Sequence, residues 1–190
     1  MAYSTKREKT KGTITDAFMD LFKTRDLAHI TVKDVCSAAG INRSTFYTYF
    51  SDVYEVKEHL ESSVLKQIRE LVMSEVRDFK TVDINDMLRL LTMVIKSNNG
   101  FPFLLVKRGD AEFVHRVAKT LVGYLSDAGF EIDEEIERTI RFCMIYHITG
   151  VAALLAETGC DDMSAEFEKL MPLVASIANE GPVTVVKKII

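Results

Sequence analysis

Apolar residues recur along most of this chain at intervals of three and four positions. The first such stripe lies near the amino terminus and contains Ile14, Ala17, Phe18, Leu21 and Phe22. Residues at this spacing lie on one face of an α-helix, so the stripe predicts an amphipathic helix. A second stripe begins at Val53 and predicts a long helix that runs to about Phe79. Later segments repeat the pattern, which predicts an all-α fold.

Two short helices are predicted between these stripes. Thr31 can cap the first of them, because its hydroxyl lies three positions before the carboxylate of Asp34. Gly40 ends that helix, since glycine adopts the left-handed backbone of a tight turn at little cost. Asn42 can cap the next helix. A helix, a glycine turn and a second helix at this spacing are typical of a helix-turn-helix.

The helix after Asn42 separates into an apolar face and a polar face. Phe46 and Phe50 are predicted to turn inward. The outward face then contains Arg43, Ser44, Tyr47 and Thr48, with Tyr49 on its flank. Arginine pairs with guanine and hydroxyls meet base edges, whereas tyrosine hydroxyls donate to phosphate. A surface helix with chance aromatics is the alternative, but such a helix has no reason to expose tyrosines beside buried phenylalanines.

The charge distribution also favours nucleic-acid binding by the first part of the chain. The net charge is −4, yet residues 1–50 hold eight basic and five acidic residues, a net of +3 that leaves −7 for the remainder. Thr31 and Lys33 stand at the start of a predicted helix, where free backbone N–H groups attract phosphate. The amino-terminal cations can add electrostatic attraction to DNA. These cations are Lys6, Arg7, Lys9 and Lys11.

The segment TVKDVCSAAGINRSTFYTYFSDVYEVKEHL resembles the DNA-binding domain of the TetR family of bacterial transcriptional regulators. The resemblance covers about Thr13 to Leu60 and is strongest over AGI-x-R-S-T-F-Y-x-Y-F. It implies an all-helical homodimer whose carboxy-terminal domain carries the dimer interface and, usually, a small-molecule pocket. We therefore divide the chain into a helix-turn-helix DNA-binding domain, 1–55, and a helical ligand-binding and dimerisation domain, 56–190.

The resemblance also assigns roles to single positions. Thr31 and Tyr49 resemble the family's phosphate contacts, and Tyr47 resembles its main aromatic contact at the DNA. The positions that resemble its base-reading or groove-facing residues are Lys33, Arg43, Ser44, Thr45 and Thr48.

One position departs from the family's pattern. Family members typically have a lysine one residue after Asp52, where it meets phosphate, but this chain has Val53. We expect a weakened backbone contact there, for which Lys57 or the amino-terminal cations compensate, and not a loss of DNA binding.

The rest of the chain is predicted to be a helical bundle. Residues 86–96 are apolar on nearly all sides, which is typical of a buried helix. A helix ended by Gly129 follows, and Asp133 caps the next. The last helix begins at Ser164, and Pro172 should kink it, because proline removes a backbone donor. The last two helices resemble those that pair as a four-helix bundle in family dimers, and NNGFPFLLVKRGDAEFVHRV resembles the branch that regulates dihydroxyacetone kinase operons.

Methionine and aromatic residues are frequent in this carboxy-terminal part. Such residues line adaptable cavities for apolar molecules, but for any one of them a place in an ordinary core is the commoner role. The pocket candidates are Met93, Phe101, Phe103, Tyr124, Met144, Tyr146 and His147. We therefore expect a repressor that a small apolar effector releases from a pseudo-palindromic operator. The alternative is a coactivator or regulator of the same fold that a protein partner controls.

Other classes of function have little support in the sequence. No GxG, GxxxxGK, HExxH or GxSxG motif occurs, so no enzyme and no cofactor are expected. The three cysteines lack CxxC spacing and the histidines stand alone, so no metal site is expected. The longest apolar run, Phe142 to Ala156, contains polar residues and is shorter than the roughly 20 residues of a membrane span. We expect a cytoplasmic, nucleoid-associated bacterial protein that binds double-stranded DNA and no membrane.

Overall fold

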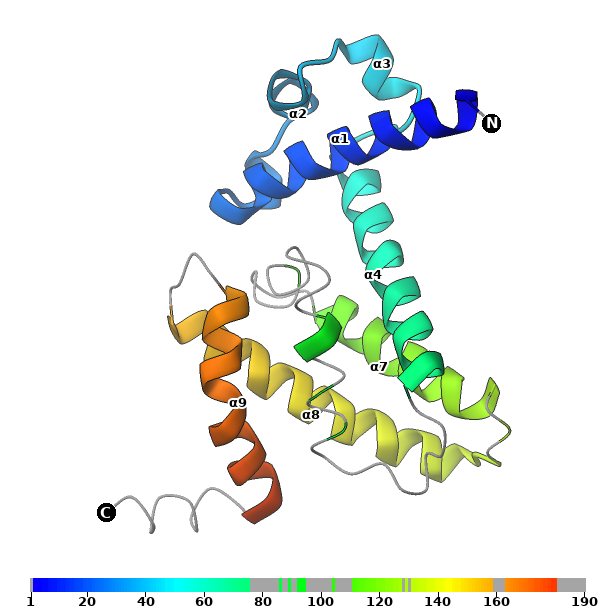
Figure 1. Cartoon of the computed structure of the whole chain (residues 1–190), viewed down its shortest axis with the longest axis vertical. Helices are drawn as coiled ribbons and strands as arrows, with labels where there is room; N and C mark the ends of the chain where they lie inside the picture. Colours follow the sequence, from blue (N-terminus) through cyan, green and yellow to red (C-terminus); the bar gives the residue numbers. More distant parts are fainter. Residues whose placement is uncertain are drawn as a thin grey trace. The chain divides into compact units, whose positions relative to one another are not determined.

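The chain is helical in every part that the structure describes. The computed structural model describes residues 2–75, 86, 89, 92–94, 104, 111–127, 129, 131–158 and 163–180. Within these ranges the backbone forms α-helices, one short 3-10 helix and turns, without a strand (Figure 1). The predicted all-α fold is confirmed.

The chain divides into two compact units, Met1–Ser63 and Val64–Ile190. The division falls within one helix, α4 (Val53–Glu75), whose first turns belong to the first unit and whose later turns belong to the second. The predicted boundary after residue 55 lies earlier on the same helix. It marks an expected change of role along the chain and stays a prediction.

The first unit contains α1 (Ala2–Thr24), the 3-10 helix η1 (Leu27–His29), α2 (Val32–Ala39) and α3 (Arg43–Tyr47), followed by the start of α4. The predicted apolar stripe of α1 faces the core, where Ile14 and Phe18 are fully buried. Phe18 stacks on Phe22, with ring centroids 5.6 Å apart. The core also receives the fully buried side chains of Val35, Phe46 and Val56.

Local hydrogen bonds define the ends of α2 and α3 as predicted. The Thr31 hydroxyl accepts from the backbone N–H of Asp34, and the Asp34 carboxylate accepts from the backbone N–H of Thr31. Gly40 ends α2 at φ 65° and ψ 32°, a left-handed conformation in which a side chain is strained. The Asn42 side-chain oxygen accepts from the backbone N–H of Thr45 at 2.8 Å. These three predictions are confirmed.

The helix after Asn42 is shorter than predicted. We expected a helix with Phe50 among its buried positions, but α3 ends at Tyr47, and Thr48 is its C-cap. The backbone N–H groups of Tyr49 and Phe50 both donate to the carbonyl of Phe46, which closes a turn. Phe50 is buried nevertheless, at 2% exposure, because this turn carries it back to the core.

The second unit contains the later part of α4 together with α7 (Ala111–Asp127), α8 (Glu134–Thr158) and α9 (Met163–Glu180). Helix α7 packs on α8, and α8 packs on α9. The fully buried side chains in this unit include Phe113, Ala118, Leu155 and Phe167. Helix α9 continues through Pro172 to Glu180, so this proline does not end the helix.

The predicted ends of α7 and α8 are confirmed. Gly129 stands two residues after α7 at φ 85°, and its N–H donates to the carbonyl of Ser126 at 3.0 Å. The Asp133 carboxylate accepts from the N–H of Ile136 at 2.8 Å and so caps α8. Two other predictions lie outside the described residues: the end of the long helix near Phe79 and most of the helix at 86–96.

Helix α8 buries one face in its second half and is largely exposed elsewhere. We expected a core helix, and Ile148, Val151 and Leu155 are indeed buried. By contrast, Phe142 is 60% exposed and Tyr146 is 73% exposed. The helix is long and apolar enough between 134 and 157 to cross a membrane by length and composition alone, but its face with Ile148, Val151 and Leu155 is buried within the protein. Its exposed apolar face therefore needs another explanation.

Candidate nucleic-acid interface

The two faces predicted for the helix after Asn42 are present on α3. Phe46 is fully buried, whereas Tyr47 beside it is 56% exposed. The two rings meet edge to face with centroids 5.6 Å apart, a favourable geometry for an aromatic pair. The buried ring thus supports the exposed one. Arg43, Ser44 and Thr48 are exposed on the same surface, while Thr45 and Tyr49 are half-buried.

The two hydroxyls on this surface have their protons engaged within the protein. Ser44 Oγ donates to the side-chain oxygen of Asn42 at 2.8 Å, and Thr48 Oγ1 donates to the Ser44 carbonyl at 2.9 Å. A hydroxyl oxygen keeps lone pairs when it donates, so both can still accept from a base amino group. The Thr48 methyl group can also contact the methyl group of thymine.

Lys33 and Thr31 are both exposed at the start of α2. The Thr31 hydroxyl donates to Asp34 Oδ2 at 2.5 Å, and Arg25 NH1 lies 3.7 Å from Asp34 Oδ1. The Thr31 hydroxyl and backbone hydrogen bonds hold the pKa of Asp34 below its ordinary value. Because Asp34 occupies the Thr31 proton, Lys33 is the stronger candidate for a phosphate contact. The sequence shows Arg25 only as one of the basic residues of this segment, whereas the structure places it beside Asp34.

The start of α4 differs from the family's pattern more than the sequence indicated. Asp52 Oδ1 accepts from the N–H of Glu55 at 2.9 Å, as predicted. Glu55 in turn accepts from the N–H of Ser51 at 2.6 Å, and this hydrogen bond lowers the pKa of Glu55. Val53 is only 5% exposed, so it faces the core of the unit and does not reach the surface.

No neighbouring side chain of α4 supplies the positive charge that is missing at Val53. Lys57 forms an ion pair with the buried Glu61, and the Lys57 side chain is only 15% exposed. Lys57 is therefore a poor candidate to compensate for Val53. Tyr54, in contrast, is 58% exposed. The sequence analysis did not include Tyr54 among the candidate surface contacts, although an aromatic residue in the polar first turn of a helix could have indicated it.

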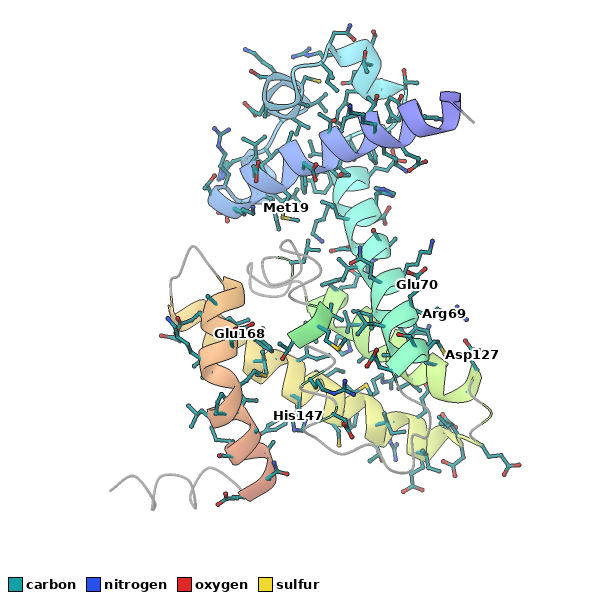
Figure 2. All side chains as sticks on the ribbon, viewed as in Figure 1. Met19, Arg69, Glu70, Asp127, His147 and Glu168 are labelled. Atoms are coloured by element: carbon teal, nitrogen blue, oxygen red, sulfur yellow. The ribbon has the colours of Figure 1, made fainter. Side chains whose placement is uncertain are left out.

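The pocket candidates in the second unit have varied surroundings. Tyr124 is buried, its hydroxyl lies 3.4 Å from the Leu65 carbonyl, and Arg69 lies over its ring at 5.4 Å. Arg69 also pairs with Asp127 at 3.1 Å, which joins α4 to α7 (Figure 2). Burial raises the pKa of Tyr124. This tyrosine therefore has a packing role whether or not a ligand binds.

Three of the remaining pocket candidates lie on α8, and the other three lie between α4 and α7 in the sequence. His147 is half-buried and bonds through Nδ1 to the Cys143 carbonyl of its own helix at 2.8 Å. Tyr146 is exposed, which fits a contact with another chain better than an internal cavity. Met93 and Met144 are half-buried. Phe101 and Phe103 lie outside the described residues.

Comparison with known proteins identifies this N-terminal arrangement. The family model of bacterial regulatory proteins, tetR family, matches residues 14–55. The chain carries the DNA-binding domain of the TetR family. The matched residues extend from the core of α1 through α2 and α3 to the first turn of α4. The match places the helix-turn-helix of residues 14–55 among the DNA-binding domains of that family.

The chain is also similar to individual proteins at low identity. The uncharacterized HTH-type transcriptional regulator YxbF of Bacillus subtilis is 23% identical over 78 residues, which cover 41% of this chain but 20% of that protein. A TetR-family transcriptional regulator of Syntrophomonas wolfei has a TM-score of 0.62 at 14% identity and covers 90% of this chain and 95% of its own. The fatty acid degradation regulator FadR of Bacillus halodurans has a TM-score of 0.60 at 17% identity, covering 87% and 94%. These two solved structures show the fold alone, and the resemblance to the dihydroxyacetone kinase branch stays a prediction.

Proposed function

We propose that this protein is a homodimeric repressor that binds a pseudo-palindromic operator through α3 and releases it when a small apolar effector binds. The observation that carries the proposal is the pairing of buried Phe46 with exposed Tyr47 on a helix whose outer surface is otherwise polar. A helix that had only to pack in a core would not present this surface. Such a protein works in the bacterial cytoplasm, on the nucleoid.

Each exposed side chain of this surface has a role that suits its chemistry. Arg43 can pair bidentately with a guanine edge, and Thr48 can meet a thymine methyl group or a base amino group. Tyr47 and Tyr49 can donate to phosphate oxygens, which orients the protein on the duplex without reading its sequence. Lys33 adds a charge contact to the backbone. Ser44, Thr45 and Thr31 complete the set that we propose to face the DNA.

The homodimer rests on the exposed face of α8. Phe142 and Tyr146 are one helical turn apart on this face, and no charged residue occurs from 142 to 156. The smaller exposed residues on the same face are Cys143, Thr149, Gly150, Ala153 and Ala156. A second copy of the chain would cover this surface. Two heads could then read half-sites roughly 34–36 Å apart, which is one turn of the duplex.

The effector would act by favouring one arrangement of the two heads. A ligand shifts a conformational equilibrium only by as much as it prefers one state. Met93 and Met144 are half-buried in the second unit, and methionine side chains adapt readily to apolar ligands. A relative of the same fold is a regulator of fatty acid degradation, which agrees with an apolar effector.

Variants on the two kinds of contact should separate base reading from phosphate binding. Arg43→Ala and Thr48→Ala should each weaken binding to a duplex recovered by selection by about 1–3 kcal/mol, because each loses a contact with a base edge. Lys33→Ala and Thr31→Ala should weaken binding to this duplex and to a mixed-sequence duplex alike, because phosphate contacts carry no sequence information. Mobility-shift titrations measure both. An apolar effector added to the same complexes should release the wild-type protein.

Lys119→Ala is the matched control, because it removes an exposed lysine from α7 in the other unit. It should leave both affinities unchanged. The DNA surface would be wrongly placed if all four head variants bound as tightly as the wild type. Equal operator affinity with and without every apolar compound tested would contradict the effector mechanism alone.

A further inference from the structure

The first half of α1 brings two cations to the carboxyl end of α3. The guanidinium carbon of Arg7 lies 5.9 Å from the ring centroid of Tyr49, and Nζ of Lys11 lies 5.3 Å from that of Phe50. Figure 1 shows the segment between α3 and α4 passing beside this half of α1. Arg7 and Lys11 are four residues apart, so they share one face of the helix. Two of the amino-terminal cations, Arg7 and Lys11, are therefore part of one surface with the end of α3.

The aromatic rings fix these cations in different ways. A cation over the face of a ring is attracted to it within about 6 Å. Phe50 is buried and also lies 5.6 Å from the His59 ring, and Lys11 above it is half-buried. Burial, and after it the charge of Lys11, lower the pKa of His59. Lys11 thus belongs to the packed corner between α1 and α4.

Arg7 remains available to a ligand. Its side chain is exposed, and the ring beneath it belongs to Tyr49, which is half-buried. A cation–π contact of the guanidinium with a ring face uses none of its N–H groups, so these can pair bidentately with a phosphate. The geometry therefore combines a fixed position with free donors.

The start of α4 lacks a cation that could serve instead. Val53 occupies the position where the family typically has lysine, and it is buried. Lys57, the one lysine or arginine in residues 53–60, pairs with Glu61. The part of the interface at the end of α3 thus depends on a cation from elsewhere, and Arg7 is the exposed cation that contacts it.

We propose that Arg7, held against the ring of Tyr49, binds a DNA phosphate and replaces the cation that Val53 removes from the start of α4. The inference rests on the proposed DNA-binding function and adds a residue to it. Tyr49 then has two roles, since its hydroxyl meets phosphate and its ring positions Arg7. Lys9 has no part in this contact, because it lies two residues from both Arg7 and Lys11 and so points to the opposite side of the helix.

The salt dependence of DNA binding tests the proposal on the full-length protein. Each phosphate that a protein cation neutralises adds about 0.9 to the slope of log K against log salt concentration. On a mixed-sequence duplex, Arg7→Ala should reduce this slope by about 0.9 per head, whereas Arg7→Lys should keep it. Lys9→Ala is the matched control, since it removes one positive charge from the opposite side of the same helix, and it should reduce the slope by less than Arg7→Ala does. Circular dichroism should show unchanged helix content in all three.

Tyr49 supplies the test of positioning. Tyr49→Phe keeps the ring and should preserve the effect of Arg7→Ala on the slope. Tyr49→Leu removes the ring, and in that background Arg7→Ala should change the slope by much less. The proposal is overturned if Arg7→Ala retains the wild-type slope, or if Lys9→Ala lowers it as much. Failure of the wild type to bind any duplex would instead overturn DNA binding itself.

Discussion

Phe46→Ala should lower the free energy of unfolding by about 3–5 kcal/mol, the usual cost of truncating a buried phenylalanine. The ring is fully buried, and it contacts both Tyr47 and Phe50, with centroid distances of 5.6 and 6.0 Å. Its removal leaves a cavity under α3 and withdraws the support of the exposed face. Urea unfolding of the full-length protein, followed through the transition that includes the first unit, measures the loss.

Tyr47→Ala is the matched control for this variant. It truncates the neighbouring aromatic residue, but the side chain is largely exposed, so its cost should stay near the 0.5–1.5 kcal/mol typical of an aromatic pair. The two variants should therefore lose different properties. Phe46→Ala chiefly loses stability, whereas Tyr47→Ala chiefly loses DNA affinity. A loss of less than about 1 kcal/mol in Phe46→Ala would show that Phe46 does not anchor α3.

Tyr146→Asp should abolish the homodimer at micromolar protein concentrations. The side chain is 73% exposed in the single chain and stands next to Phe142 on the apolar face of α8. If a second copy covers this face, the new carboxylate is buried without a partner, which costs several kcal/mol. Truncation of a central interface aromatic typically costs about 2 kcal/mol or more in its own right. Sedimentation velocity of the wild type and the variant measures the change.

Two control variants separate the loss of the apolar ring on α8 from the general effect of a new carboxylate. Tyr146→Phe should remain dimeric, because it keeps the apolar ring. Lys119→Asp introduces the same carboxylate on the exposed face of α7 and should also remain dimeric. If Tyr146→Asp sediments as the wild type does, the α8 face is not the dimer interface. If the wild type sediments as a monomer, the protein is not a homodimer under these conditions.

The helix ends could be predicted because the interactions that make them are local. Thr31 and Asp34 are three residues apart, and so are Asn42 and Thr45, so sequence spacing alone brings the bonded groups together. The positive φ of Gly40 follows from the same logic, since glycine is the residue that tolerates it best. The buried positions of α1 and α3 followed from periodicity.

What could not be predicted depends on how distant segments pack. The sequence shows a missing lysine at Val53, but only the fold shows that this position is buried and that Glu61 engages Lys57. The contact of Arg7 with Tyr49 joins residues 42 positions apart, so no local pattern reveals it. Periodicity likewise detects the apolar face of α8, but it cannot tell whether the same chain or another covers it.

Selection of bound duplexes from a random pool tests most directly whether α3 reads DNA sequence. The wild-type protein should enrich a pseudo-palindrome whose half-sites lie about one helical turn apart, roughly 10 base pairs from centre to centre. The same selection with Tyr47→Ala should recover this motif with weaker enrichment. Enrichment of no motif by the wild type, with binding that depends only on salt, would contradict this role of α3.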